Sequence, residues 1–282
     1  MRTALITTVR GRHRHLRAQQ NALARLEPVP DQRIVVAIDD PGVARIVRSQ
    51  ATVVAVPTGH TGLPIAAARN AGAAAAISAG AELLVFLDVD CLPGPRLLHH
   101  YLAAAQAGEP ALLCGPVAYL PAPPAEGYDL NRLADHPFHP GRPAPAAGQR
   151  QTGGDHRLFW SLSFAIAAAD WSRVGGFCEL YQGYGGEDTD FAMLARQAGL
   201  GLTWVGGAAA YHQWHPVGSP PVGHLTDIVR NAALFAKRWG WWPMGGWFTE
   251  FEALGLARRT SDGGWQVAYD RQVGAEPAGR SR

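Results

Sequence analysis

Leu83-Leu84-Val85-Phe86-Leu87-Asp88-Val89-Asp90 is the stretch that decides the fold class of this chain of 282 residues. It opens with an uninterrupted apolar run, which is typical of a strand that is buried on both faces of a sheet. Two aspartates close the run. Because residues i and i+2 of a strand point to the same face, we expect Asp88 and Asp90 to present their carboxylates at one place where the strand ends.

Further apolar runs precede this strand, and helical stretches separate them. The runs lie at residues 4–9, 33–38 and 52–56, and an Ala-rich helix is expected at 65–79. Strands that alternate with helices predict an α/β fold with a mostly parallel central sheet covered by helices. Ligands of such sheets bind beyond the carboxyl ends of the strands. Polar residues stand at those ends here: Thr8, Arg10, Asp39, Asp40, Asp88 and Asp90.

The composition is that of a globular protein without a strong overall field. Hydrophobic residues make up 47%, charged residues 17%, and the net charge is +2. This balance argues against obligate nucleic-acid binding. The 3 cysteines stand far apart, which argues against a disulfide scaffold and a cysteine zinc site. No stretch is typical of a signal peptide or a membrane span, so we expect a cytoplasmic protein, free or peripheral to a membrane.

The chain is expected to divide into a main domain at 1–224 and a C-terminal extension at 225–282. Proline and glycine crowd residues 119–157, which excludes a regular helix or a central strand. A lid and an unstructured linker both fit this excursion. The extension begins with an amphipathic helix and continues with tryptophans that suit a sugar platform, packing against the sheet or a dimer contact, so a homodimer is one option. The tail beyond Ala275 is predicted to be disordered.

A divalent cation would resolve the repulsion between the two strand-end aspartates. Two close carboxylates repel each other unless a cation or a proton lies between them. Mg²⁺ or Mn²⁺ would satisfy them and would also hold phosphate oxygens. The imidazole of His212 suits the remaining ligand position, in a segment at 211–216 expected to form a loop. Surface aspartates and hydrogen-bonded structural histidines are the alternatives, and whether His215 binds the metal instead of His212 is open.

A second acidic group opens a predicted helix. Gly183-Tyr184-Gly185-Gly186-Glu187-Asp188-Thr189-Asp190 combines glycines, which let a ligand approach the backbone, with acids that suit a helix N-terminus. A carboxylate here could take a proton from a hydroxyl group. The alternative is a capped helix whose first turn is merely acidic.

Basic residues could contact phosphate at two places. Arg69 stands among small residues in Ala68-Arg69-Asn70-Ala71-Gly72, and Arg10 and Arg12 follow the first strand. The planar guanidinium group suits phosphate oxygens. A solvated arginine is the alternative at each position.

Taken in order, the motifs resemble those of family 2 glycosyltransferases with the GT-A fold. The resemblance covers about residues 2–215 and rests on the order and spacing of the whole set. The later segment resembles the galactosyltransferase-type C-terminal region. The motifs are Thr8-x-Arg10, Asp39-Asp40, Ala68-Arg69-Asn70-x-Gly72, Phe86-Leu87-Asp88-Val89-Asp90, Val174-Gly175-Gly176-Phe177, Gly185-Gly186-Glu187-Asp188 and His212.

The resemblance implies a GT-A catalytic domain at 1–224 that binds a UDP-sugar across the strand ends. Asp90 and His212 would hold Mn²⁺ or Mg²⁺. Asp188 would deprotonate the acceptor, and Glu187 would hold the donor sugar or the acceptor. The remaining implied donor contacts are Thr8 and Arg10 in the nucleotide pocket, Asp39 with Asp40 at the base, Arg69 at the base or diphosphate, Asp88 at the ribose or metal, Val89 in the nucleotide-sugar site, and Gly185 and Gly186 beside the sugar.

The predicted activity is therefore the inverting transfer of a hexose from a UDP-sugar to a hydroxyl acceptor, which could be a glycan, a lipid or a small molecule. A base and a metal suffice for a single displacement at the anomeric carbon. A retaining GT-A transferase or a nucleotidyltransferase is an alternative, because those enzymes also place acids at strand ends. A sugar-nucleotide- or glycan-binding module without turnover is another.

Overall fold

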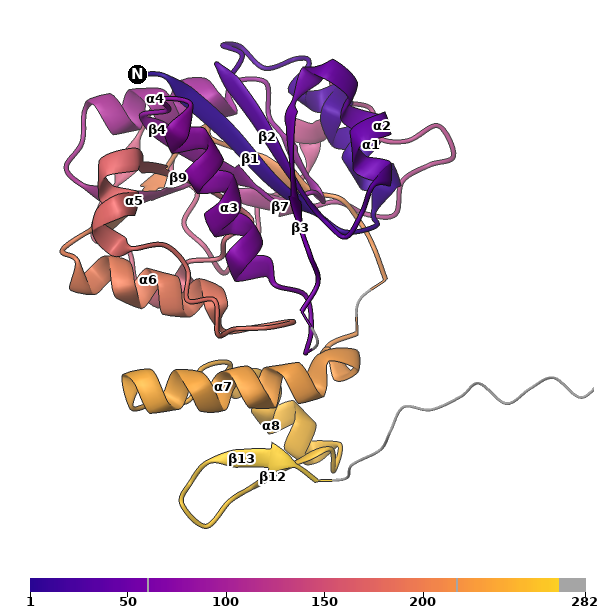
Figure 1. Cartoon of the computed structure of the whole chain (residues 1–282), viewed down its shortest axis with the longest axis vertical. Helices are drawn as coiled ribbons and strands as arrows, with labels where there is room; N and C mark the ends of the chain where they lie inside the picture. The colour runs from indigo at the N-terminus through magenta and orange to yellow at the C-terminus, as the bar shows by residue number, and fades with distance from the viewer. Residues whose placement is uncertain (60, 217, 269–282) are drawn as a thin grey trace, which may run out of the picture. The chain divides into compact units, whose positions relative to one another are not determined.

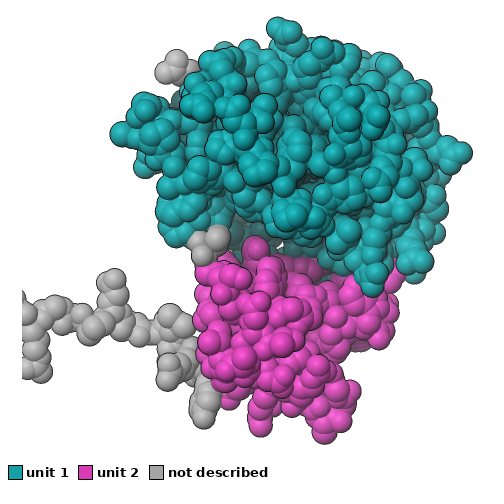
Figure 2. Space-filling model, turned by 180° about the vertical axis from the view of Figure 1, so that it is seen from behind, with its two compact units in different colours: residues 1–183, 187–216 teal, residues 184–186, 217–282 magenta. Residues whose placement is uncertain are grey.

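The computed structural model describes residues 1–59, 61–216 and 218–268, and the predicted disordered tail beyond Ala275 lies outside them. The chain forms two compact units (Figure 2). Unit 1 comprises Met1–Gly183 and Glu187–Pro216, and unit 2 comprises Tyr184–Gly186 and Val217–Arg282. The predicted boundary after residue 224 therefore falls within unit 2.

An 8-stranded sheet forms the centre of unit 1 (Figure 1). Neighbours are parallel from β3 through β2 and β1 to β4, and β6 is parallel to β10. Strand β9 runs antiparallel to both β4 and β6, and β8 runs antiparallel to β10. The predicted α/β fold with a mostly parallel central sheet is confirmed. In sheet order the strands are β3 (Thr52–Val56), β2 (Gln32–Ile38), β1 (Thr3–Val9), β4 (Leu83–Leu87), β9 (Ser163–Ala167), β6 (Ala111–Cys114), β10 (Gly201–Val205) and β8 (Arg150–Gln151).

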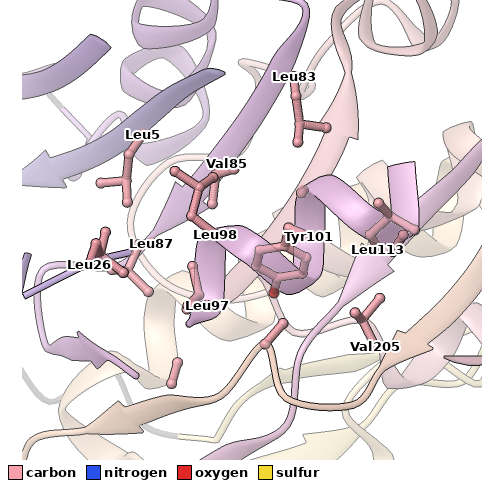
Figure 3. Packing of buried hydrophobic residues seen from close by; sticks show 14 of the residues in the cluster. Leu5, Leu26, Leu83, Val85, Leu87, Leu97, Leu98, Tyr101, Leu113 and Val205 are labelled. Atoms are coloured by element: carbon pink, nitrogen blue, oxygen red, sulfur yellow. The ribbon is translucent and has the colours of Figure 1, made fainter. Parts of the chain in front are cut away.

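Successive strand residues point to opposite sides, so an uninterrupted apolar strand such as β4 presents hydrophobic side chains on both faces of the sheet. Helices cover both faces. On one face, Ile6 of β1 lies against α3, whose Gly72 lets the helix come close to the strand. On the other face, Leu5 of β1 packs with Leu98 and Tyr101 of α4, as Figure 3 shows. The helices of unit 1 are α1 (His13–Leu23), α2 (Gly42–Val47), α3 (Ile65–Ser78), α4 (Leu97–Gln106), α5 (Ala168–Val174) and α6 (Glu187–Gln197).

A small sheet corrects the prediction of a loop at 211–216. Strand β11 (Ala210–His212) lies between β5 (Cys91–Pro93) and β7 (Val117–Tyr119). His212 pairs with Cys91 on one side and with Tyr119 on the other. The loop prediction was wrong for these residues because partners from distant segments complete the strand. The pairing brings His212 beside the turn that follows β4.

The excursion at 119–157 is irregular, as its proline and glycine content predicts. Its regular structure is limited to two short 3-10 turns, Leu133–Asp135 and the start of His156–Leu158, and to the edge strand β8, together with the last residue of β7. Leu120 and Leu133 are buried against Leu92 of β5 and Ala22 of α1, so part of the excursion belongs to the core. Its use as a lid stays a prediction.

Unit 2 has a hydrophobic core of its own. It consists of α7 (Leu225–Trp239), α8 (Gly245–Ala253) and the hairpin of β12 (Ala257–Arg259) and β13 (Trp265–Val267). Phe248 stacks on Trp265 with ring centroids 5.0 Å apart, and Trp242 and Trp247 pack against this cluster. Packing thus accounts for part of the tryptophan run. No helix in the described part of the chain has the length and hydropathy needed to cross a bilayer.

Candidate active site

Asp90 lies within a cluster of possible metal ligands in unit 1. The Nε2 atoms of His212 and His215 lie 3.6 and 3.5 Å from Asp90 Oδ2, and the ligand atoms of all three residues lie within 4.8 Å of one another. One carboxylate and two imidazoles form a donor set that fits Mn²⁺ better than Mg²⁺, because Mg²⁺ prefers oxygen ligands alone. Both histidines therefore face Asp90, so the choice between His212 and His215 that the sequence left open is not decided by distance.

The neighbours of Asp90 keep its carboxylate ionised, and one of them, Arg12, already sets a positive charge beside it. Burial acts to raise the pKa of Asp90, but the hydrogen bond from His215 and the charges of His212 and Arg12 overcome it and lower the pKa to about 2. Burial lowers the pKa of His212. A metal ligand must be an ionised carboxylate or an uncharged imidazole. The lowered pKa of Asp90 favours the first, and the lowered pKa of His212 favours the second at neutral pH.

Arg12 is a site residue that the sequence left undecided between phosphate contact and solvent. Its Nη1 lies 3.1 Å from Asp90 Oδ2. The backbone places it there in the left-handed region, with φ 47° at the N-cap of α1. The loop before it is tied to the end of β2, because Gly11 N donates to Asp40 Oδ2 at 2.8 Å and His13 Nε2 lies at the same carboxylate. In the sequence, the feature that pointed to Arg12 is its place in the basic segment that follows the first strand.

Asp88 has partners of its own and does not belong to the metal cluster. Arg69, only 4% exposed, lies between Asp88 Oδ1 and Glu187 Oε1, at 3.2 Å from each. Its guanidinium also lies over the ring of Phe177, 5.1 Å from the centroid. The Asn70 side chain fixes the backbone of Phe177. Its Oδ1 accepts from Phe177 N at 2.8 Å, and its Nδ2 donates to Phe177 O at 2.9 Å. Arg69 is thus a buried ion-pair centre rather than a solvated helix arginine.

Asp188 lies in the first turn of α6, next to Glu187, and its pKa is close to 7. Burial raises the pKa of Asp188 to about 7, the Glu187 carboxylate adds to the rise, and Arg69 opposes it. Thr189 N donates to Asp188 Oδ1 at 2.6 Å, which holds the carboxyl group at the helix N-terminus. Burial likewise raises the pKa of Asp88 to about 6, against the effect of Arg69. A carboxylate with a pKa near the working pH is suited to general base catalysis.

The other predicted donor contacts lie at the ends of β1 and β2, in the turn after β4, or in unit 2. Asp39 is held at φ 42° and accepts hydrogen bonds from the backbone N–H of Thr58, at 2.8 Å, and from its hydroxyl group. Asp40 is engaged by Gly11 and His13, as described above. The remaining residues are Thr8 near the end of β1, Arg10 just after it, Val89 buried between the two aspartates, and Gly185 and Gly186 in unit 2, with φ 92° and 90°.

Solved structures share this architecture. TarS of S. aureus has a TM-score of 0.55 at 16% identity, over 84% of this chain and 39% of that one. A 1–349 fragment of TarS in complex with UDP has a TM-score of 0.56 at 15% identity, over 84% of this chain and 65% of that one. The chain has the GT-A glycosyltransferase fold. The predicted GT-A resemblance is confirmed, and the assignment to family 2 stays a prediction.

Sequence relatives agree with the GT-A fold. Residues 155–215, which include α6 and β11, match the family described as N-terminal domain of galactosyltransferase. Validoxylamine A glucosyltransferase of Streptomyces hygroscopicus subsp. limoneus is 30% identical over 206 residues, which cover 64% of this chain and 45% of that protein. The protein of the same name from subsp. jinggangensis is 32% identical over 161 residues, 50% of this chain and 37% of that protein. The chain therefore spans less than half of the length of either relative.

Proposed function

We propose that this GT-A protein is an inverting, metal-dependent glycosyltransferase that moves a hexose from a UDP-sugar to a hydroxyl acceptor. The observation that carries the proposal is the bridge from Asp88 through Arg69 to Glu187. It links the turn that bears Asp90 to the helix that bears Asp188, two segments about a hundred residues apart. The relatives' name as glucosyltransferases and the UDP bound to the TarS fragment support the same substrate class.

Each residue of the site has a defined role in this proposal. Asp90, His212 and His215 would hold Mn²⁺, which when bound would supply positive charge to balance that of the leaving diphosphate. Asp188 accepts the proton of the acceptor hydroxyl as that oxygen attacks the anomeric carbon. Glu187 holds the donor sugar or the acceptor while it keeps Arg69 in place. The donor pocket is completed by residues of unit 1: Thr8, Arg10, Asp39, Asp40, Asp88 and Val89.

A thermal-shift screen of nucleotide-sugars with and without Mn²⁺ tests the donor class. A bound donor stabilises the folded protein by an amount that grows with the logarithm of its concentration over its Kd, so UDP-sugars should raise the Tm and Mn²⁺ should enlarge the rise. UDP-glucose comes first because the relatives are named glucosyltransferases. A panel in which no UDP-sugar shifts the Tm would contradict the proposal.

The anomeric configuration of the product separates this mechanism from a retaining one. A single displacement inverts the anomeric carbon, so NMR should show a β-linked product from an α-linked donor. A product that keeps the α configuration would remove the base role from Asp188 and favour a retaining transferase. A cytoplasmic location and a homodimer stay predictions from the sequence.

A further inference from the structure

The turn between β4 and β5 is held at every carbonyl group. The Asp88 carbonyl accepts from Gln19 Nε2 at 2.7 Å and from Cys91 N at 2.8 Å. The Cys91 carbonyl accepts from Gln19 Nε2 at 2.9 Å. Between them, the Val89 carbonyl accepts from Gln213 Nε2 at 3.4 Å and the Asp90 carbonyl from Gln213 N at 2.6 Å. These bonds restrain the backbone of all three turn residues, 88–90.

Gln19 is the residue that joins the two ends of the turn. It lies on the buried face of α1, beside Leu16 and Leu23, and its exposed fraction is 0%. A primary amide has two N–H donors, and here each is directed at one carbonyl of the turn. Its Oε1 lies 3.3 Å from the hydroxyl of Thr7, which is itself 3.0 Å from the Leu87 carbonyl. A buried amide without hydrogen-bond partners destabilises the folded protein. The amide of Gln19 has partners for both its nitrogen and its oxygen.

We propose that Gln19 is a positioning residue that sets the directions of the Asp88 and Asp90 side chains, with Gln213 as the second clamp. The inference rests on the proposed function, since it concerns the same two carboxylates. Asp88 must reach Arg69 while Asp90 must reach His212 and His215, so the two side chains leave a short turn toward different partners. Rotation of one peptide plane in that turn would redirect one carboxylate. Gln19 restrains this rotation because it binds the carbonyl of Asp88, which begins the turn, together with that of Cys91, the first residue of β5.

Gln19→Met tests the role, because methionine fills a similar volume and donates no hydrogen bond. The affinity for Mn²⁺ is measured from the loss of the free-ion EPR signal in the presence of UDP. Residues that orient metal ligands typically change metal affinity by about 10–100-fold when replaced. We expect Gln19→Met to weaken Mn²⁺ binding by about tenfold or more on that scale. Gln19→His, whose ring can still donate to one carbonyl, should weaken it less and provides a milder variant if Gln19→Met does not fold.

Tyr101→Phe is the matched control for a lost buried hydrogen bond. The Tyr101 hydroxyl is 0% exposed and bonds Ser163 Oγ and Gly115 N, each at 2.9 Å, away from the turn. It should lower the Tm without changing Mn²⁺ affinity. Unchanged Mn²⁺ affinity in the Gln19 variants would overturn the inference, as would an equal loss in Tyr101→Phe at equal Tm. A wild-type protein that binds no Mn²⁺ would instead refute the proposed metal site, and the inference with it.

Discussion

At the scale of single residues, Asp188 owes its predicted chemistry to its surroundings. A free aspartate is fully ionised at pH 7 and is a weak base, whereas burial and Glu187 raise the pKa of Asp188 to about 7. Only the ionised form can accept the acceptor's proton. The transfer rate should therefore rise with pH through about 7 and level off above it. A kcat profile from pH 5 to 9 measures this.

Asp188→Asn should remove the base and keep the shape of the site. General base catalysis contributes about 10²–10⁴-fold, so kcat should fall by a factor in that range. The affinity for UDP, measured by calorimetry, should stay close to that of the wild type, because Asp188 is assigned to the acceptor. Loss of UDP binding in parallel with kcat would place Asp188 in the donor site instead.

The raised pKa of Asp188 also predicts how stability depends on pH. Because the folded-state pKa lies above the unfolded value, the folded protein binds this proton more tightly. The resulting stabilisation is complete below about pH 4 and is lost as the pH rises through about 7. The Tm of Asp188→Asn minus that of the wild type should therefore increase as the pH is raised from 5 to 8. A difference in Tm that stays constant over this interval would show that Asp188 titrates normally.

Each histidine of the metal cluster should contribute to cation binding. His212 and His215 lie at nearly the same distance from Asp90 Oδ2, so neither is favoured by geometry. Replacing either one by alanine should weaken Mn²⁺ binding at least tenfold, on the order expected for disturbance of a metal site. His156→Ala, which loses a hydrogen bond to the Leu200 carbonyl, is the control. Binding that survives His215→Ala unchanged would leave Asp90 and His212 as the ligands.

At the scale of elements, the packing of α3 on the sheet depends on one glycine. A Cβ on Gly72 would lie 2.5 Å from Ile6 Cγ2 and 3.0 Å from Val36 Cγ2. Gly72→Ala should destabilise the protein by about 1–3 kcal/mol, since overpacking outweighs the gain in helix propensity. The same change at Gly246 in α8, where a Cβ meets no atom within 4 Å, should stabilise by about 0.5–1 kcal/mol. Urea unfolding measures both, and equal signs would contradict the packing argument.

Elements with strong local patterns could be predicted from the sequence, and elements that depend on distant partners could not. The apolar runs predicted β2, β3 and β4 to within a residue or two, and the amphipathic helix expected at the start of the extension is α7. Strand β11 was missed because three residues carry little periodic signal and the strand exists through pairing with β5 and β7. The irregular excursion was recognised from composition alone.

The same distinction holds for the candidate site. The motif order placed Asp90, His212 and Asp188 among the important residues, and all lie in unit 1. The motifs could not predict the contacts. Arg69 bridges Asp88 and Glu187 only because the fold brings α3, the end of β4 and the start of α6 together. Gln19 could have been identified as a polar residue on the apolar face of an amphipathic helix, between Leu16 and Leu23.

At the scale of the whole molecule, the two units have separate hydrophobic cores, and the metal cluster draws only on unit 1. Phe248→Ala removes a fully buried ring from the core of unit 2 and should destabilise that core by about 3–5 kcal/mol. Hydrogen exchange should then speed up in α7 and α8, while the amides of β1 and β4 keep their protection. Phe164→Ala, which removes a fully buried ring in β9, is the reciprocal control and should expose the central sheet. Equal loss of protection in both units after Phe248→Ala would mean that they unfold as one cooperative body.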